Sequence, residues 1–183
     1  LAVGFLYTSG IIQSFQEISS LKVCDGGTNI DVWLNHAAEK PRLWQKNSGC
    51  SGSLSAPDMV LTPLPASAQF QLLPAQIFEF LSIFYQSQEL YRSSGGVHTS
   101  ALFSNMELIY CIEDIGRHNT LDKIAGRILM NNLNSPNRLI TTTGRISLEM
   151  MQKAAILQAP FVISRTSPTS ASIQLAQTLG ITL

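Results

Sequence analysis

The second half of the chain alternates between short apolar runs and segments with helical spacing. Residues 97–103 and 108–113 are apolar runs separated by a Ser-Asn turn, which predicts a β-hairpin. Later apolar runs predict strands at 139–142, 161–163 and 181–183. Strand–helix–strand units of this length predict a parallel sheet with right-handed crossovers, so the expected fold class is α/β.

Helices between these strands are predicted from apolar spacing and from capping residues. Leucine, isoleucine and alanine recur at helical spacing over 121–129, with Asn119 as the expected N-cap. The next helix is expected to start after Ser147. The last is expected to open at Ser167-Pro168 and to end at Gly180.

The first half is less regular. The pattern predicts helices at 1–9 and 76–86 and a strand at 29–34. A Gly/Ser-rich tract at about 46–57 cannot pack a core, so we expect a mobile loop there.

Length and composition fit one globular unit with a buried core. The chain has 183 residues, of which 45% are hydrophobic. We divide it into an N-terminal part, 1–72, that carries the loop, and an α/β core, 73–183, with one continuous domain as the alternative. The sequence begins inside a helical pattern and ends inside an apolar run, so we expect it to continue at both ends.

Charge and cysteine content narrow the function classes. Twelve basic and twelve acidic residues give a formal net charge of zero, which argues against a general nucleic-acid or membrane-surface binder. No apolar run reaches the ~18 residues of a membrane span. Three widely spaced cysteines argue against a disulfide framework and for a reducing compartment, so we expect a cytoplasmic protein without a structural zinc site.

Polar clusters follow three of the predicted strands. The first, at 113–123, reads Glu-Asp-Ile-Gly-Arg-His-Asn-Thr-Leu-Asp-Lys and offers Arg117 and His118 to a ligand at a helix start. A capped helix with an Asp114–Arg117 ion pair is the structural alternative. Because the carboxyl ends of parallel strands share one edge, these clusters should line one polar crevice.

The second and third clusters, at 141–147 and 164–169, repeat the pattern of hydroxyls with an arginine before a helix. They resemble a phosphate cradle but lack the spacing of a Walker loop. With the first cluster they supply the candidate cofactor-binding residues, which are Arg117, His118, Thr143, Gly144, Arg145, Ser147, Ser164 and Thr169.

Cys50 is the candidate catalytic residue. It lies in the Gly/Ser-rich tract, where a thiol is unhindered and able to receive an atom in one place and deliver it in another. An incidental surface thiol is the alternative. Cys24 and Cys111 lie on apolar segments and are expected in the core, while His36 and His98 are interpreted as structural histidines.

Several segments resemble the formate dehydrogenase accessory sulfurtransferase family, FdhD. The matching motifs are Leu1–Leu6, Ser9–Ile12, Gly95–His98, Glu113–Asn119, Leu121–Lys123, Thr143–Ser147, Glu149-Met150, Lys153–Ala155, Ser164, Ser167–Thr169 and Gly180–Leu183.

The resemblance implies a three-layer, cytidine-deaminase-like α/β fold and a sulfurtransferase. Cys50 would accept persulfide sulfur from a cysteine desulfurase and pass it to the molybdenum bis(molybdopterin guanine dinucleotide) cofactor needed by formate dehydrogenase. The guanine-nucleotide phosphates would bind Arg145 and the helix start at Ser147. The family's second loop cysteine is replaced here by Ser53, and the zinc signature of deaminases is absent, so no zinc is expected.

Two other functions are weighed against this one. In the first, the chain is a non-catalytic chaperone that binds the guanine dinucleotide cofactor, and Cys50 is dispensable. The second is a metal-dependent nucleoside hydrolase or deaminase, for which the sequence lacks the metal ligands. The sequence leaves open whether two copies of the chain form a homodimer.

Overall fold

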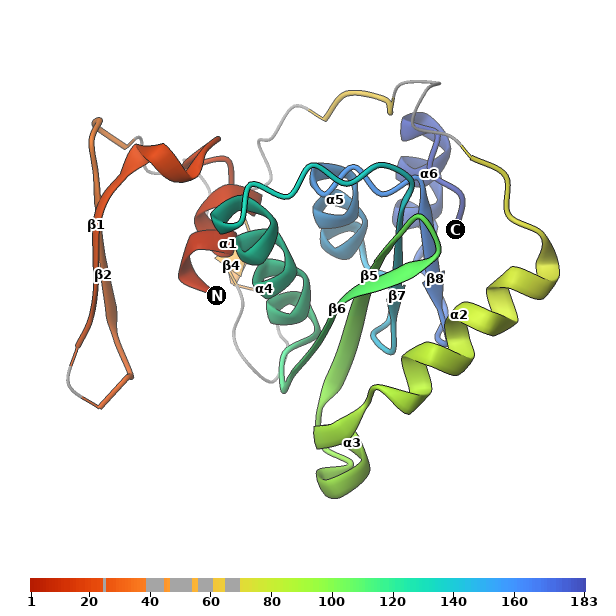
Figure 1. The fold of residues 1–183 in the computed structure, drawn as a ribbon. Coiled ribbons are helices and arrows are strands. Elements are labelled where there is room, and N and C mark those ends of the chain that lie inside the picture. The colour runs from red at the N-terminus through yellow and green to blue at the C-terminus, as the bar shows by residue number, and fades with distance from the viewer. Residues whose placement is uncertain (25, 39–44, 47–53, 56–60, 65–69) are drawn as a thin grey trace.

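The computed structural model describes residues 1–24, 26–38, 45–46, 54–55, 61–64 and 70–183 (Figure 1). A four-stranded mixed sheet forms its centre, made of β5 (His98–Ser104), β6 (Glu107–Asp114), β7 (Arg138–Thr142) and β8 (Phe161–Ser164). The helices are α1 (Ala2–Thr8), α2 (Pro74–Gln86), α3 (Glu89–Ser94), α4 (Arg117–Met130), α5 (Leu148–Ile156) and α6 (Ser170–Leu179). In the described residues, no helix is both long and apolar enough to cross a membrane.

Two small antiparallel sheets precede the central one. They pair β1 (Ile18–Val23) with β2 (Ile30–Leu34) and β3 (Gln45–Lys46) with β4 (Leu54–Ser55). Strand β2 and helices α1 and α2 confirm the elements predicted in the first half. The predicted mobile loop falls largely on residues 47–53 and 56–57, which lie outside the described residues.

The central sheet has the order β6-β5-β7-β8, and only part of it is parallel. The predicted hairpin is confirmed as β5–β6, but β5 also pairs antiparallel with β7. Strands β6 and β7 therefore run in the same direction with β5 between them, and only β7–α5–β8 is a parallel unit of neighbouring strands. The predicted parallel sheet is confirmed only in part, because the hairpin strand β5 inserts between β6 and β7 and runs antiparallel to both. The final predicted strand is a single bridge between Phe161 and Thr182.

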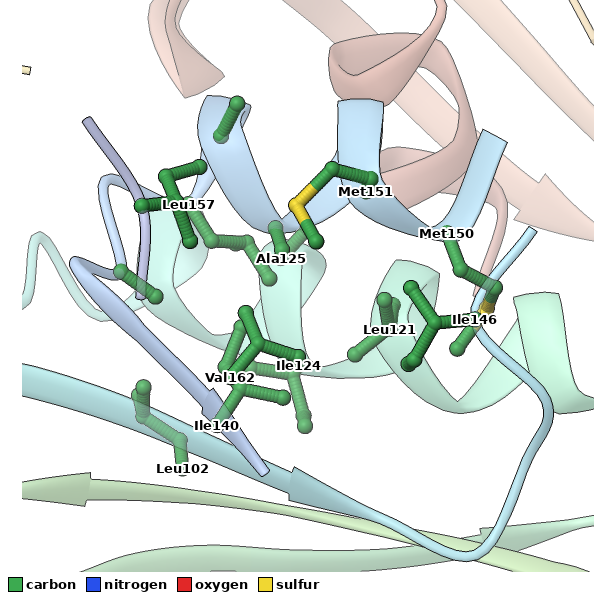
Figure 2. Packing of buried hydrophobic residues seen from close by; sticks show 14 of the residues in the cluster. Leu102, Leu121, Ile124, Ala125, Ile140, Ile146, Met150, Met151, Leu157 and Val162 are labelled. Carbon is green, nitrogen blue, oxygen red and sulfur yellow. The ribbon is translucent and has the colours of Figure 1, made fainter. Parts of the chain in front are cut away.

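Helices cover both faces of this sheet, and the strand residues alternate between two apolar clusters. Leu102, Ile140 and Val162 pack beneath α4 and α5, as Figure 2 shows, in a cluster that also includes Ala176 and Leu179 of α6. Their neighbours Ala101, Phe103 and Leu139 point the other way and pack with Phe80 and Phe84 of α2. Because every layer is anchored in a core, the ends of the strands have fixed positions.

Helix α1 packs directly against α4, although the two are far apart in the sequence (Figure 1). A side chain at Gly4 would overlap the carbonyl oxygen of Asp122, and a Cβ at Gly126 would lie 3.0 Å from the Gly4 nitrogen. Only glycine permits this approach of the two backbones. The first helix is thereby fixed to the helix that begins at the strand-end edge.

Candidate functional site

The polar clusters meet at one edge of the central sheet. The register places His98 opposite Asp114, Ser100 opposite Thr142, and Thr142 beside Ser164. The carboxyl ends of β6, β7 and β8 therefore share this edge, as the sequence predicts. Reversal of β5 adds its amino end, and thus His98, to the same edge.

The first cluster is organised by Asp114. Its Oδ1 accepts hydrogen bonds from Gly116 N at 2.8 Å and from Asn119 Nδ2 at 3.0 Å, and its Oδ2 lies 2.6 Å from Lys123 Nζ. Burial alone would raise the pKa of Asp114, but Lys123 and the two hydrogen bonds hold it below its ordinary value.

Two sequence predictions about this cluster are corrected. The helix begins at Arg117, and its N-cap Gly116 lies three residues before the predicted cap Asn119, because the Asp114 carboxylate binds the Gly116 amide and takes the place of a cap. The Asp114–Arg117 ion pair weighed as the alternative does not form, since Asp114 pairs with Lys123 instead.

Arg117 joins the first cluster to the second. A Cβ on Gly144 would lie 2.8 Å from Arg117 Cβ and 3.2 Å from its Cδ, so the stem of Arg117 crosses directly over the glycine. Arg117 Nε is buried and has no hydrogen-bond partner among the described residues. The position therefore requires glycine and fixes where the Arg117 side chain leaves the helix.

His118 lies behind the edge rather than on it. Only 3% of its surface is exposed, and its Nε2 lies 3.4 Å from both Ser147 Oγ and Glu149 Oε2. Burial, followed by the charges of Arg117, Lys153 and His98, lowers the pKa of His118 to about 3. The imidazole is therefore neutral at physiological pH and contributes no charge to the crevice.

The second cluster is held by hydroxyl hydrogen bonds. Ser147 caps α5 as predicted, with its Oγ accepting from Met150 N. Thr142 Oγ1 accepts from Gly144 N at 3.1 Å, and Thr143 Oγ1 accepts from Thr99 N at 3.0 Å. Arg145 is exposed between these anchored residues. The turn thus presents one cation from a rigid backbone.

The third cluster is tied to the second. Ser164 Oγ donates to the Gly144 carbonyl oxygen at 2.9 Å. Helix α6 begins at Ser170 with Thr169 as its cap, rather than at the predicted Ser167-Pro168. Pro168 is held in a parallel bridge with Ile146, and Thr169 N donates to the Ile146 carbonyl oxygen, which delays the helix. Thr169 Oγ1 accepts from Ser172 N in this cap.

Three arginines, Arg117, Arg145 and Arg165, give the edge its charge. Among the described residues, no acidic side chain lies within ion-pair distance of any of them. Burial first, and then the charges of Arg117 and Arg145, lower the pKa of His98. The edge is therefore cationic, although the charge of Arg117 also acts on the buried carboxyl group of Glu149, and it favours a multiply charged anion.

A pocket of about 310 Å³ opens at this edge. Thr143 is the predicted site residue that lines it, and its other lining residues are Tyr91, Gly95, Gly96, Val97, His98 and Arg165. The sequence alone favours a structural role for His98. The hairpin contained the missing signal, because the residue that starts β5 must lie opposite Asp114, which ends β6.

The described cysteines are poor nucleophiles. A hydrogen bond to Asp31 raises the pKa of the Cys24 thiol. Burial, followed by the charges of Glu113 and Glu89, raises the pKa of Cys111 to about 11. Both thiols stay protonated at neutral pH. Cys50 lies outside the described residues. In the part of the chain that the structure describes, no three His, Cys, Asp or Glu side chains form a metal site.

The structure is therefore a mixed α/β fold with a cationic crevice at the ends of its strands. Comparison with known proteins identifies its family. Residues 1–183 match the FdhD/NarQ family, and the chain belongs to it.

Curated relatives agree over the full chain. The sulfur carrier protein FdhD of Listeria monocytogenes (strain F2365) is 34% identical over 190 residues, covering all of this chain and 73% of the relative. The protein of the same name from Bacillus subtilis is 32% identical, covering all of this chain and 72% of its own length. A solved structure, described as a formate dehydrogenase accessory protein of Desulfotalea psychrophila, superposes with a TM-score of 0.77 at 32% identity over 98% of this chain and 69% of that one.

Proposed function

We propose that this chain is a sulfur carrier for formate dehydrogenase. It would take persulfide sulfur on Cys50 from a cysteine desulfurase and deliver it to the molybdenum bis-guanine dinucleotide cofactor, which is its substrate. One observation carries the proposal that the chain binds the cofactor: none of the three arginines forms an ion pair with an acidic side chain among the described residues. The names of the relatives support the sulfur-carrying half.

In this proposal the phosphates of the guanine nucleotide bind along the sheet edge. Arg117 and Arg145 supply guanidinium groups, which match phosphate oxygens in pairs. The start of α5, capped by Ser147, adds backbone N–H groups. Thr143 Oγ1 accepts from Thr99 N and donates to the Thr99 carbonyl oxygen across 3.5 Å, a long hydrogen bond that it would exchange for one to a phosphate oxygen. Gly144 and Ser164 fix the turn that holds these groups, while His118 and Thr169 support it from behind and beside.

The sulfur chemistry needs a thiolate, and Cys50 is the cysteine left to provide one after Cys24 and Cys111. The Cys50 thiolate attacks the outer sulfur of the donor persulfide, a new S–S bond forms, and the donor cysteine leaves as a thiolate. In the second transfer the S–S bond breaks and Cys50 is regenerated as a thiolate. The sulfur becomes a sulfide ligand by taking two electrons from the reduced metal of the cofactor.

Mass spectrometry tests the carrier step. After incubation with a cysteine desulfurase and cysteine, we expect about 32 Da to be added at Cys50 and the adduct to be removed by a thiol reductant. Cys24→Ser and Cys111→Ser are the matched controls, and both should keep the adduct. An adduct that survives Cys50→Ala would place the carrier elsewhere.

A cofactor-binding chaperone is the second candidate, favoured by Ser53 at the position of the family's second cysteine. It predicts that Cys50→Ala still supports formate dehydrogenase activity in cells. The sulfur-carrier proposal predicts loss of that activity, with binding of guanosine diphosphate (GDP) by the Cys50→Ala protein unchanged. Growth on formate and calorimetry together separate the two.

A further inference from the structure

Large apolar side chains are exposed at all three junctions between the strands of the edge and the helices that follow them. Ile115 lies between β6 and α4, Leu148 opens α5, and Ile173 lies near the start of α6. They are 65%, 43% and 41% exposed, respectively. One exposed apolar residue is common on a protein surface and needs no explanation. Three at one edge form a set, which we call the apolar rim.

Contacts between the junctions hold the apolar rim together. Leu148 follows the cap of α5, whose hydroxyl oxygen lies 3.4 Å from His118 Nε2 in the first turn of α4. Ile173 follows Ser172, whose Oγ donates to the Ile146 carbonyl oxygen at 2.9 Å. The starts of α4, α5 and α6 are thus fixed against one another. The apolar rim therefore borders the same edge as the arginines.

The exposed surface of the three junctions has the composition of a protein interface. Over 114–119, 143–149 and 164–173, every exposed residue is apolar, an arginine or a residue with a hydroxyl group. Asp114 and Glu149, the acids in these ranges, are not exposed. Protein interfaces are enriched in arginine and depleted in lysine, aspartate and glutamate, and their centres are more apolar than the rest of the surface. The junctions therefore fit a surface that another protein covers.

The size of this surface favours a partner that binds and leaves again. A stable interface uses roughly 20–30 residues on each side, which is more than the three junctions expose. A second copy held permanently over the edge would also close the route by which a ligand leaves the crevice. Both points favour a transient contact with a different protein.

The two partners in the proposed function have different needs. A cysteine desulfurase needs access to Cys50, whereas the acceptor enzyme needs the cofactor, which is proposed to bind along the edge. An enzyme that takes up the cofactor must therefore bring its empty cofactor site over the arginines. Apolar contacts around that opening would be stabilised by their own burial and would exclude water during the transfer. The apolar rim lies where such contacts are needed.

We propose that the apolar rim, formed by Ile115, Leu148 and Ile173, is the surface on which cofactor-free formate dehydrogenase docks to receive the cofactor. The inference rests on the proposed function, because it gives the acceptor enzyme a place relative to the bound nucleotide. The arginines bind the cofactor, and the apolar rim binds the enzyme that accepts it.

Binding of purified, cofactor-free formate dehydrogenase to the full chain, measured by biolayer interferometry, tests this surface. The rim variant carries Ile115→Gln, Leu148→Gln and Ile173→Gln. We expect it to bind the enzyme at least about tenfold more weakly than the wild type does, because the apolar centre of the contact is lost. Calorimetry with GDP and persulfide loading of Cys50 should give wild-type values, which also shows that the variant is folded.

The matched control replaces three apolar side chains that are more exposed than Leu148 and lie away from the edge. Two are on α2, near its contact with Met106 in the β5–β6 turn, and one ends α4. The control variant carries Leu73→Gln, Phe78→Gln and Met130→Gln. It should bind formate dehydrogenase as the wild type does.

The inference is wrong if the rim variant binds formate dehydrogenase as tightly as the wild type, or if the control variant is weakened equally. It is also wrong if the rim variant loses GDP binding or persulfide loading, or changes from dimer to monomer in sedimentation, because the ligand, the desulfurase or a second copy then occupies the rim. A wild type that binds GDP and loads sulfur but does not bind formate dehydrogenase overturns the inference alone. If the wild type does none of the three, the proposed function fails as well.

Discussion

At the residue scale, a buried charge cluster lies behind the crevice. Lys153 Nζ lies 2.6 and 2.7 Å from the two carboxylate oxygens of Asp122, and at most 4% of either residue is exposed. Glu149 Oε1 lies 3.7 Å from the same ammonium, and burial raises the pKa of Glu149. One buried cation therefore serves two carboxyl groups, and neutral His118 adds no further positive charge.

This arrangement predicts a loss of stability in mild acid. The pKa of His118 is about 3 when folded against an ordinary value of 6.5, so the unfolded chain binds one more proton below pH 6.5. The contribution is fully present above that pH and is lost as the pH falls toward 3. We expect the free energy of unfolding to drop by about 2 kcal/mol between roughly pH 7.5 and pH 5.

Urea unfolding of the wild type and His118→Gln at several pH values measures this effect. The raised pKa of Glu149 acts with the opposite sign, so the quantity that matters is the difference between the two proteins. Arg117, Lys153, His98 and Ser147 also face the imidazole and remain in both. Parallel pH profiles for wild type and variant would show that His118 does not titrate as described.

At the element scale, the junctions between strands and helices depend on close contacts between clusters. Gly144 passes under Arg117, Ser164 donates to the Gly144 carbonyl, and Pro168 bridges to Ile146. These contacts join three turns that are separate in the sequence. A substitution in one turn should therefore displace residues in the other two.

Gly144→Ala tests this coupling. The new Cβ would lie 2.8 Å from Arg117 Cβ, an atom fixed to the first turn of α4 that cannot swing away. We expect a loss of about 1–3 kcal/mol in the free energy of unfolding and weaker pyrophosphate binding. Gly96→Ala is the matched control, because its nearest neighbour would be Ser94 O at 3.8 Å, and its stability should change by less than about 0.5 kcal/mol. Equal stability of the two variants would contradict the close packing.

The first residue of a helix was predictable where a cap in the same turn sets it, and not where a contact with a distant residue sets it. Ser147 caps α5 by a bond within its own turn, so the sequence reveals it. The start of α6 is set by the pairing of Pro168 with Ile146, more than twenty residues away. The start of α4 is set by Asp114, which resembles a partner for Arg117 until the structure shows Lys123 in that place.

At the scale of the whole molecule, the sequence predicts an edge lined with polar clusters but not which residues reach it. The predicted hairpin reverses β5 relative to β6, but apolar periodicity does not show which strand lies on the other side of β5, so its pairing with β7 could not be deduced. That reversal brings His98 to the edge. Arginines at the strand ends were visible in the sequence, whereas only the packed structure shows that, among the residues it describes, no acidic side chain forms an ion pair with them.

The glycine crossing of α1 and α4 has a consequence for folding cooperativity. Thr8 of α1 donates to the Asp122 carboxylate that also binds Lys153, so detaching α1 would open a buried ion pair to water. We therefore propose that residues 1–9 unfold together with the core at 73–183. Hydrogen–deuterium exchange should show α1 amides exchanging as slowly as those of α4, by global unfolding. If α1 exchanges through local opening while α4 stays protected, the first helix belongs to a separate folding unit.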